Sequence, residues 1–222
     1  APLIARIPQG RRQVIWTGQH WSPELTFALY EAGFGRDESH ALRAFAETPM
    51  HERADSIWEG RLNDARSFAW MVEQIAYFLE IDAGFEDGEP HWLVVLGDTT
   101  SALAGALAGA KLGIPVYHVE AGSRSGDRSQ PEELNRKLID QCATAHAYSY
   151  HCDGTNLERE GIRCSFWSGE IAIEPLIGMK AEPGEEIIVT IHRAETLNNP
   201  QALGGIMQFL RELAEDHRVV FY

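Results

Sequence analysis

Short apolar runs alternate along this chain with longer stretches in which apolar residues recur at intervals of three and four. The short runs are rich in Val and Ile, which is typical of strands buried on both faces of a sheet. The longer stretches have the spacing of amphipathic helices. Strands that alternate with helices predict βα units, parallel sheets and right-handed connections. The predicted fold class is therefore α/β.

The pattern places the elements as follows. The predicted strands span residues 13–17, 92–96, 114–119, 145–150, 164–167, 186–191 and 219–222. The predicted helices span residues 23–32, 54–80, 101–111, 131–142, 155–161 and 200–217. Residues 33–50 mix Gly, Asp, Ser and Pro without a clean period, which predicts a loop with irregular helical pieces. A charged stretch with a proline at 178–184 indicates a linker, so we expect one domain over residues 1–175 and the start of a second over 176–222.

Composition and charge exclude several classes of protein. A chain of 222 residues with 44% hydrophobic content can bury one core and part of another. The formal net charge of -14, from 33 acidic and 19 basic residues, argues against a nucleic-acid partner. No run approaches the roughly 18 apolar residues of a membrane helix, and the first residues lack a signal-peptide pattern. We expect a cytoplasmic protein with no membrane partner.

Cysteine usage predicts neither a disulfide framework nor a metal site. Cys142, Cys152 and Cys164 are odd in number and lack the paired short spacing of a zinc ribbon. We interpret them as buried or partly buried thiols, and a reactive thiol is the less favoured alternative.

Acidic residues stand where two predicted strands end. Asp98 follows the strand at 92–96, and Glu120 follows the strand at 114–119. In open α/β sheets the carboxyl ends of the strands form the edge that binds ligands, so the two acids predict a site. Glu132 lies close after them in the chain, in the first turn of the helix that begins at Pro131.

Each acid also has a structural interpretation. Asp98 could cap the helix that follows it, and Glu120 could pair with Arg124. Glu132 and Glu133 suit the first turn of a helix whatever their function, because acids there favour the helix dipole. The combination of the acids favours a site.

Fewer basic residues than acidic ones are candidates for the predicted site. His192 and Arg193 follow the strand at 186–191, although a His-Arg pair at a strand end could also be a solvated turn. Arg124, Arg128 and Arg136 could contact phosphate, but beside so many acids they could equally form surface ion pairs.

Four motifs together resemble one family. The chain is similar to the UDP-N-acetylglucosamine 2-epimerases, weakly over residues 33–54 and closely over most of the rest. Thr17-Gly18-Gln19-His20 also corresponds to a segment of that family. The four motifs are Gly97-Asp98-Thr99-Thr100-Ser101, His118-Val119-Glu120-Ala121-Gly122, Pro131-Glu132-Glu133 with Asn135-Arg136, and Val189-Thr190 with His192-Arg193.

The resemblance implies a GT-B-like architecture of two Rossmann-like domains with a nucleotide sugar in the cleft between them. In the non-hydrolysing branch, UDP is eliminated to leave 2-acetamidoglucal and is then added back with inversion at C2. The hydrolysing branch releases N-acetylmannosamine and UDP, and the motifs do not separate the two. The resemblance implies no nicotinamide or metal cofactor, a UDP-sugar substrate, and a homodimer, for which the helix at 54–80 is our candidate contact.

Site residues are carried over position by position. Asp98, Glu120, Glu132 and His192 match the family's catalytic positions. We expect the three acids to handle proton transfer and His192 to neutralise charge near the diphosphate. Substrate contacts are expected from Gln19, His20, Thr99, Arg136 and Arg193.

The chain also departs from the family. It lacks the first strand with its Gly-Thr-Arg-Pro-Glu motif and most of the second domain, so we expect a fragment of an ordinary epimerase. The alternative is a short relative that kept only a binding or assembly role. Glu170 and Thr196 replace two common asparagines. A glycosyltransferase or nucleotide-sugar binding module on the same fold is the competing class, but it would not need three clustered acids.

Overall fold

The computed structural model describes residues 6–7, 15, 61–82, 91–180, 184–191 and 194–221. The chain divides into two compact units, Ala1–Ile177 and Gly178–Tyr222. Each unit is described separately below.

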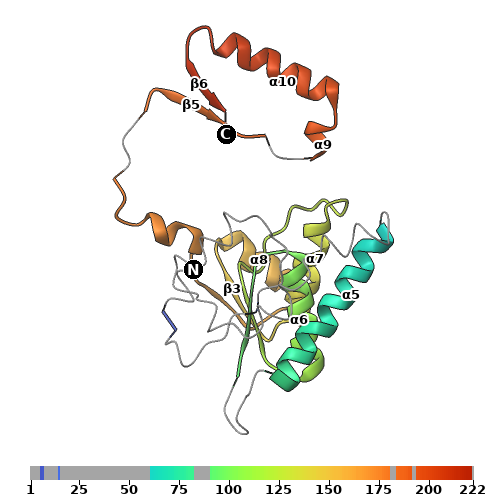
Figure 1. Ribbon diagram of the computed structural model, residues 1–222. Helices are drawn as coiled ribbons and strands as arrows, with labels where there is room; N and C mark the ends of the chain where they lie inside the picture. Colours follow the sequence, from blue (N-terminus) through green and yellow to red (C-terminus); the bar gives the residue numbers. More distant parts are fainter. Residues whose placement is uncertain are drawn as a thin grey trace. The chain divides into compact units, whose positions relative to one another are not determined.

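A four-stranded parallel sheet forms the centre of the first unit (Figure 1). The spatial order of the strands is β1-β2-β3-β4, which is also their order in the sequence. The carboxyl ends of all four strands therefore share one edge. The strands are β1 (Leu93–Leu96), β2 (Val116–Val119), β3 (Ala145–Tyr148) and β4 (Ser165–Trp167).

Helices connect these strands as crossovers (Figure 1). α5 precedes β1 and packs against α6, which in turn packs against α7. The helical segments are α5 (Arg61–Tyr77), the π-helical turn η2 (Phe78–Asp82), α6 (Thr100–Leu112), α7 (Pro131–Cys142), α8 (His151–Arg159) and the 3-10 helix η3 (Ile171–Leu176).

Small residues let α6 lie close to the sheet. Ala104 and Ala106 are fully buried, and a Cβ added at Gly109 would lie 2.9 Å from side-chain atoms of both Leu93 and Val116. On the other side of α6, the buried side chains of Met71 and Ile75 from α5 complete the core. The Ala- and Gly-rich sequence of α6 is thus required by its position between the sheet and α5.

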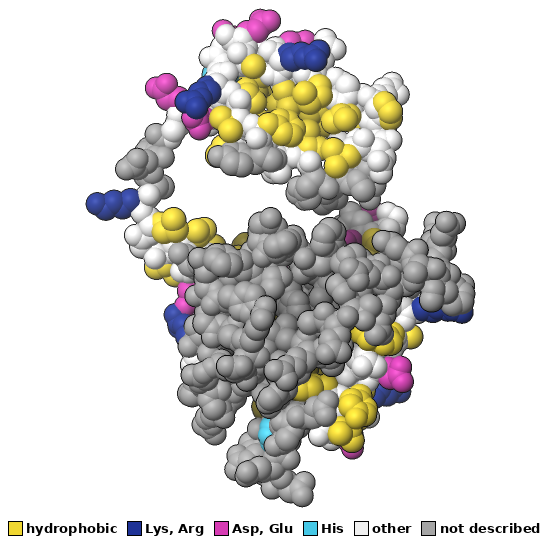
Figure 2. Space-filling model, in the orientation of Figure 1, with side chains coloured by type: hydrophobic (Ala, Val, Ile, Leu, Met, Phe, Trp, Pro, Cys, Tyr) yellow, Lys and Arg dark blue, Asp and Glu magenta, His cyan; other side chains and the backbone are white. Residues whose placement is uncertain are grey.

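The second unit is a single βαβ arrangement. Strands β5 (Glu186–Val189) and β6 (Arg218–Phe221) pair in parallel, with α9 (Ala194–Leu197) and α10 (Pro200–Leu213) between them. Asn199 caps α10 by accepting a hydrogen bond from the Ala202 amide at 3.1 Å. Figure 2 shows apolar side chains gathered on the surface of this unit. Its large exposed apolar residues are Met179, Ile188, Leu197, Met207, Phe209 and Phe221.

The predicted α/β class with parallel sheets is confirmed, and six of the predicted strands are present within a few residues of their expected bounds. The strand expected at 145–150 ends at Tyr148, and the helix expected at 155–161 begins at His151. The reason is local: the Asp153 carboxylate accepts from the Tyr150 amide and starts α8 early. The helix expected at 54–80 is described from Arg61 onward. The elements expected at 13–17, 23–32 and 33–50 lie outside the described residues, apart from Ile15.

Within the described residues, no helix is long and apolar enough to cross a membrane.

Candidate active site

Two acidic turns leave adjacent strands at the same edge of the sheet. Leu96 of β1 pairs with Val119 of β2, and the Gly97 amide donates to the Val119 carbonyl at 3.0 Å. Asp98 and Glu120 follow directly, so each acid emerges at a strand's carboxyl end as the sequence predicted.

Glu120 is an acid whose ionisation is altered by its surroundings. Burial raises the pKa of its carboxyl above the ordinary 4.5, and the nearby charges of Glu170 and Asp98 raise it further, while His118 opposes them. A carboxyl with a raised pKa gives up and takes back a proton more easily near neutral pH than an ordinary glutamate does. Glu120 is therefore suited to general acid–base work.

The backbone at Glu120 is held in an unfavourable conformation. Its φ of 65° lies in the left-handed region, where a residue with a Cβ pays roughly 1–2 kcal/mol. Directly after Glu120, the Ala121 amide donates to the Ala147 carbonyl at 3.0 Å, and Gly122 packs so closely that an added Cβ would lie 2.4 Å from the Asp153 carbonyl oxygen. The turn is thus fixed from β3 and from α8, which keeps the Glu120 side chain at this edge.

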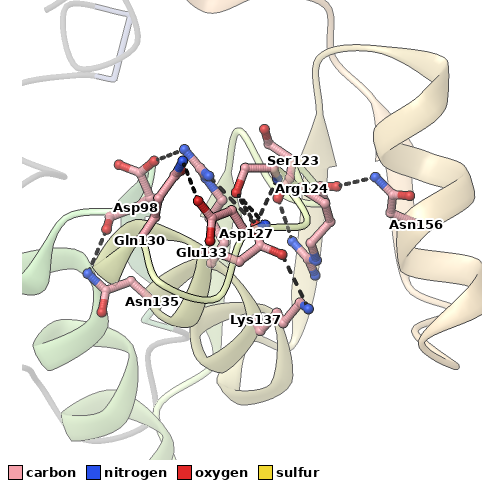
Figure 3. A network of polar contacts seen from close by, with 12 residues as sticks. Asp98, Ser123, Arg124, Asp127, Gln130, Glu133, Asn135, Lys137 and Asn156 are labelled. Carbon is pink, nitrogen blue, oxygen red and sulfur yellow. Dashed lines mark hydrogen bonds and ion pairs between the residues drawn. The ribbon is translucent and has the colours of Figure 1, made fainter. Parts of the chain in front are cut away.

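Asp98 does not cap the helix that follows it, so that structural interpretation is wrong. Thr99 is the N-cap of α6, and its hydroxyl accepts from the Ala102 amide at 3.1 Å. The Asp98 carboxylate instead pairs with Arg136 at 2.5 Å, and its carbonyl accepts from the Asn135 amide group at 2.8 Å. Figure 3 shows these contacts from α7 to Asp98. Asp98, Thr99 and Arg136, all predicted site residues, are therefore brought together.

The two glutamates at the start of α7 differ completely. Glu132 is exposed, and among the described residues its carboxylate has no hydrogen-bond or ion-pair partner. Glu133 is 1% exposed and accepts from the Ser125 amide at 2.8 Å and from the Ser125 hydroxyl at 3.1 Å (Figure 3). It also pairs with Lys137 at 3.2 Å. Burial opposes its ionisation, but the bonds from Ser125 and Lys137 prevail and hold the pKa of Glu133 below its ordinary value. Of these two glutamates, Glu132 is the one whose carboxylate is available to a substrate.

Arg124 does not form the ion pair with Glu120 that the sequence suggested, and it pairs instead with one buried acid and one exposed acid. Its side chain is only 9% exposed and binds Asp140 at 2.7 Å and Glu160 at 2.6 Å and 2.9 Å. Burial opposes the charge, but the bonds from Glu160 and Asp140 raise the pKa of the guanidinium above its ordinary value. With both carboxylates in place, Arg124 is committed to the fold and is not available as a phosphate ligand.

The sequence interpretation missed two buried polar residues behind the acids, His118 and Asp140. The His118 ring lies between the Asp140 carboxylate, at 2.6 Å, and the Gly97 carbonyl, at 2.9 Å. A signal for both existed: His118 is a polar residue inside a valine-rich strand, and Asp140 is two helical turns after buried Glu133 on the same face of α7.

The remaining predicted residues, Gln19, His20, His192 and Arg193, lie outside the described residues. No group of three or more His, Cys, Asp or Glu side chains that could hold a metal ion is found in the described part of the chain. All three cysteines are free thiols. Cys142 is partly buried, as expected, whereas Cys152 and Cys164 are exposed, contrary to the expectation.

Acids at adjacent strand ends of an open parallel sheet define an α/β protein of the class in which that edge is where a ligand site is expected. More narrowly, the chain belongs to the UDP-N-acetylglucosamine 2-epimerase family, whose model, described as "UDP-N-acetylglucosamine 2-epimerase", matches residues 4–222. The predicted family is thus confirmed.

Individual relatives agree. The chain is 35% identical over 150 residues to the UDP-2,3-diacetamido-2,3-dideoxy-D-glucuronate 2-epimerase of Pseudomonas aeruginosa, covering 61% of this chain and 42% of that one. It is 35% identical over 163 residues to the UDP-N-acetylglucosamine 2-epimerase of Methanocaldococcus jannaschii, covering 64% of this chain and 44% of the relative. The chain therefore spans less than half the length of these curated relatives.

A solved structure shows the same fold. The M. jannaschii UDP-GlcNAc 2-epimerase in complex with UDP-GlcNAc and UDP superposes with a TM-score of 0.65 at 26% identity, covering 94% of this chain and 57% of that one. Such enzymes are GT-B-like, in agreement with the Rossmann-like sheet expected from the sequence.

Proposed function

We propose that this chain carries the acid–base part of a UDP-N-acetylglucosamine 2-epimerase, an isomerase that interconverts UDP-N-acetylglucosamine and UDP-N-acetylmannosamine. The observation that carries the proposal is the pair of turns at the ends of β1 and β2, which brings Asp98 beside a Glu120 whose pKa is raised. Membership of the epimerase family supplies the substrate class.

The proposed reaction has two halves. A base removes the C2 proton, the C1–oxygen bond breaks, and UDP leaves with that electron pair, giving the unsaturated sugar. UDP then adds back to C1 while a proton is delivered to the opposite face of C2. One acid cannot serve both faces, so at least two carboxyl groups are needed. We assign proton transfer and its polarisation to Asp98, Glu120 and Glu132 together.

Charge on the departing diphosphate requires cationic partners. We assign this role to His192, with Arg193 and Arg136 beside it, and substrate contacts to Gln19, His20 and Thr99. Support for Arg136 comes from its ion pair with Asp98, which places a cation at the acidic edge. We extend the proposal to domains over 1–175 and 176–222, with the acids in the first and nucleotide binding in the second. A homodimer and a cytoplasmic location also belong to the proposal and rest on the sequence arguments alone.

The decisive experiment is incubation of the chain with UDP-N-acetylglucosamine in deuterated water. Deuterium at C2 of newly formed UDP-N-acetylmannosamine supports the proposal. Free N-acetylmannosamine and UDP would support the hydrolysing alternative. Unchanged sugar overturns both for this chain, and bound but unchanged UDP-sugar, detected by calorimetry, would favour a binding module. Glu120→Gln is the matched control, because it keeps the shape of the side chain and removes the titratable proton.

A second sugar belongs in the same assay. The identity to the P. aeruginosa enzyme equals that to the M. jannaschii one, so UDP-2,3-diacetamido-2,3-dideoxy-D-glucuronate is the competing substrate. The two sugars differ at C3 and C6, which separates the outcomes cleanly: C2 deuterium in only one of them names the substrate.

A further inference from the structure

His118 lies fully buried at the end of β2, with both ring nitrogens engaged. Nδ1 contacts Asp140 Oδ1 at 2.6 Å, and Nε2 contacts the Gly97 carbonyl oxygen at 2.9 Å. A carbonyl oxygen carries no hydrogen, so Nε2 must be the donor in that contact. The protonation of His118 then depends on which group carries the hydrogen between Nδ1 and Asp140.

The other partners of Asp140 indicate which group carries this hydrogen. Its Oδ2 accepts from the Gly122 amide at 3.1 Å and from the Arg124 guanidinium at 2.7 Å. Burial opposes the ionisation of Asp140, but donation from an amide and a guanidinium to Oδ2 favours the ionised carboxylate independently of His118. An ionised Asp140 can only accept, which leaves the hydrogen on Nδ1.

We propose that His118 is held as an imidazolium between Gly97 and Asp140, and that it acts as a positioning residue that fixes the Glu120 turn against the Asp98 turn. Gly97 precedes Asp98, and Gly122, held by Asp140, follows Glu120 by two positions. The His118–Asp140 pair therefore makes a hydrogen bond to each of the two acid-bearing turns from the buried side. It also supplies contacts that hold Glu120 in its left-handed conformation.

The imidazolium has an electrostatic consequence as well. The groups that face this region are Asp98 after β1, Glu120 after β2, Arg124 in the following loop, Asp140 on α7, His146 on β3 and Glu170 before η3. Burial, Glu170 and Asp98 raise the pKa of Glu120, and His118 lowers it. His118 thus limits how far the neighbouring acids raise the pKa of Glu120. The inference rests on the proposed function only for the claim that Glu120 exchanges a proton with a sugar.

A neighbouring histidine provides an internal comparison. His146 pairs with His118 in the β2–β3 register and is also buried, and by the same rule both of its ring nitrogens donate to backbone carbonyls, those of Cys164 at 2.9 Å and Asp140 at 2.8 Å. An Asp140→Asn substitution keeps that backbone carbonyl, so it changes the side-chain partner of His118 and leaves both partners of His146 in place.

Long-range ¹H–¹⁵N NMR spectra of the ¹⁵N-labelled chain test the charge directly, because an imidazolium and a neutral ring give different nitrogen shifts. At pH 7.5 we expect an imidazolium at His118, which becomes a neutral ring with its proton on Nε2 in Asp140→Asn. The His146 signals should stay unchanged. Glu160→Gln is the control: it alters the other partner of Arg124, and His118 should remain charged. A neutral His118 in the unsubstituted chain overturns the inference, as does an Asp140→Asn chain in which His118 stays charged.

A second measurement tests the effect on Glu120. In a ¹³C titration of side-chain carboxyls, the Glu120 midpoint should rise in Asp140→Asn, and also in His118→Asn, which serves if the first variant fails to fold. In both, the turnover number for the deuterium-exchange reaction should fall tenfold or more with little change in KM, because substrate contacts remain. An unmoved Glu120 midpoint overturns the positioning role. A charged His118 with no C2 exchange in the unsubstituted chain would defeat the proposed function and leave the charge assignment intact.

Discussion

The acids at the edge of the sheet and the acids one layer behind them are neighbours with opposite behaviour. At the edge, Glu120 has a raised pKa, and Glu132 is exposed with no hydrogen-bond or ion-pair partner among the described residues. Behind them, Glu133 and Asp140 are each 1% exposed, and their partners hold their pKa values down. Burial alone does not decide a carboxylate's charge: cationic and N–H donors in place keep it ionised, and other acids nearby favour its protonation. These properties suit the edge to the proton exchange that we propose and suit the buried layer to its support.

The largest effect should come from Glu120→Gln. In the C2 exchange assay, we expect a loss of about 10²- to 10⁴-fold in turnover, the usual contribution of a positioned general acid or base. The free energy of unfolding, measured in urea, should not fall. A loss of stability comparable to the loss of turnover would make Glu120 part of the supporting layer and would break the comparison.

Asp140→Ala should be the most destabilising substitution in the supporting layer. It leaves the buried charges of Arg124 and His118 without this partner, and removing one partner of a buried ion pair costs about 3–5 kcal/mol. Urea unfolding monitored by circular dichroism measures the change. Glu160→Ala is the control at the exposed end of the same network and should cost less than about 1 kcal/mol. Equal effects of the two substitutions would contradict the role of burial.

The adjacent pair on α7 sharpens the comparison at single-residue resolution. Glu133→Gln weakens the bonds to Ser125 and Lys137 inside the protein, and we expect a loss of about 1–3 kcal/mol. Glu132→Gln should change stability by less than about 0.5 kcal/mol, as for most surface substitutions, while it lowers turnover. Differential scanning calorimetry and the exchange assay separate the two. The reverse pattern would assign catalysis to Glu133.

Much of this arrangement could be predicted from the sequence. The valine-rich runs that stop at Gly97-Asp98 and at Glu120 indicated two strand ends at one edge, because local pattern is enough to place a strand, although Val94 and Leu96 of β1 are exposed and the burial expected on both faces is wrong for that strand. The role of Asp140 could not be predicted in this way. Its partner His118 lies 22 positions away, and only packing of α7 on β2 brings the two together. Likewise, neighbouring Glu132 and Glu133 look alike in sequence, and the contact with Ser125 distinguishes them.

The pH dependence of stability should differ in sign between the two layers. Asp140 has a lowered pKa in the folded state, so the stability it contributes is present above its ordinary value of 3.8 and is lost as the pH falls through the folded value. Glu120 has a raised pKa, so its contribution is present below 4.5 and is lost as the pH rises through the folded value. At pH 7, Asp140→Asn should therefore lower the urea midpoint and Glu120→Gln should raise it slightly.

Both differences should shrink on acidification. The Glu120→Gln difference should vanish below about pH 4.5, and the Asp140→Asn difference should persist to lower pH. Urea midpoints measured at several pH values between 3 and 8 give both curves. If Glu120→Gln lowers the midpoint at pH 7, its carboxylate is stabilised by the fold, and the distinction between edge and support fails at its central residue.

The smallest effect separates the two residues that precede α6. Thr99→Ala removes the hydroxyl that accepts from the Ala102 amide, and loss of such a cap costs about 1 kcal/mol. Asp98→Asn leaves the cap in place and weakens only the partly exposed pair with Arg136, so it should cost less in unfolding free energy. Its effect should instead appear in turnover, because the Asn side chain no longer carries the charge that helps to raise the pKa of Glu120. Urea unfolding and C2 exchange on both variants decide the matter: if Asp98→Asn destabilises the chain more than Thr99→Ala does and leaves exchange unchanged, Asp98 belongs to the support and the edge consists of Glu120 and Glu132 alone.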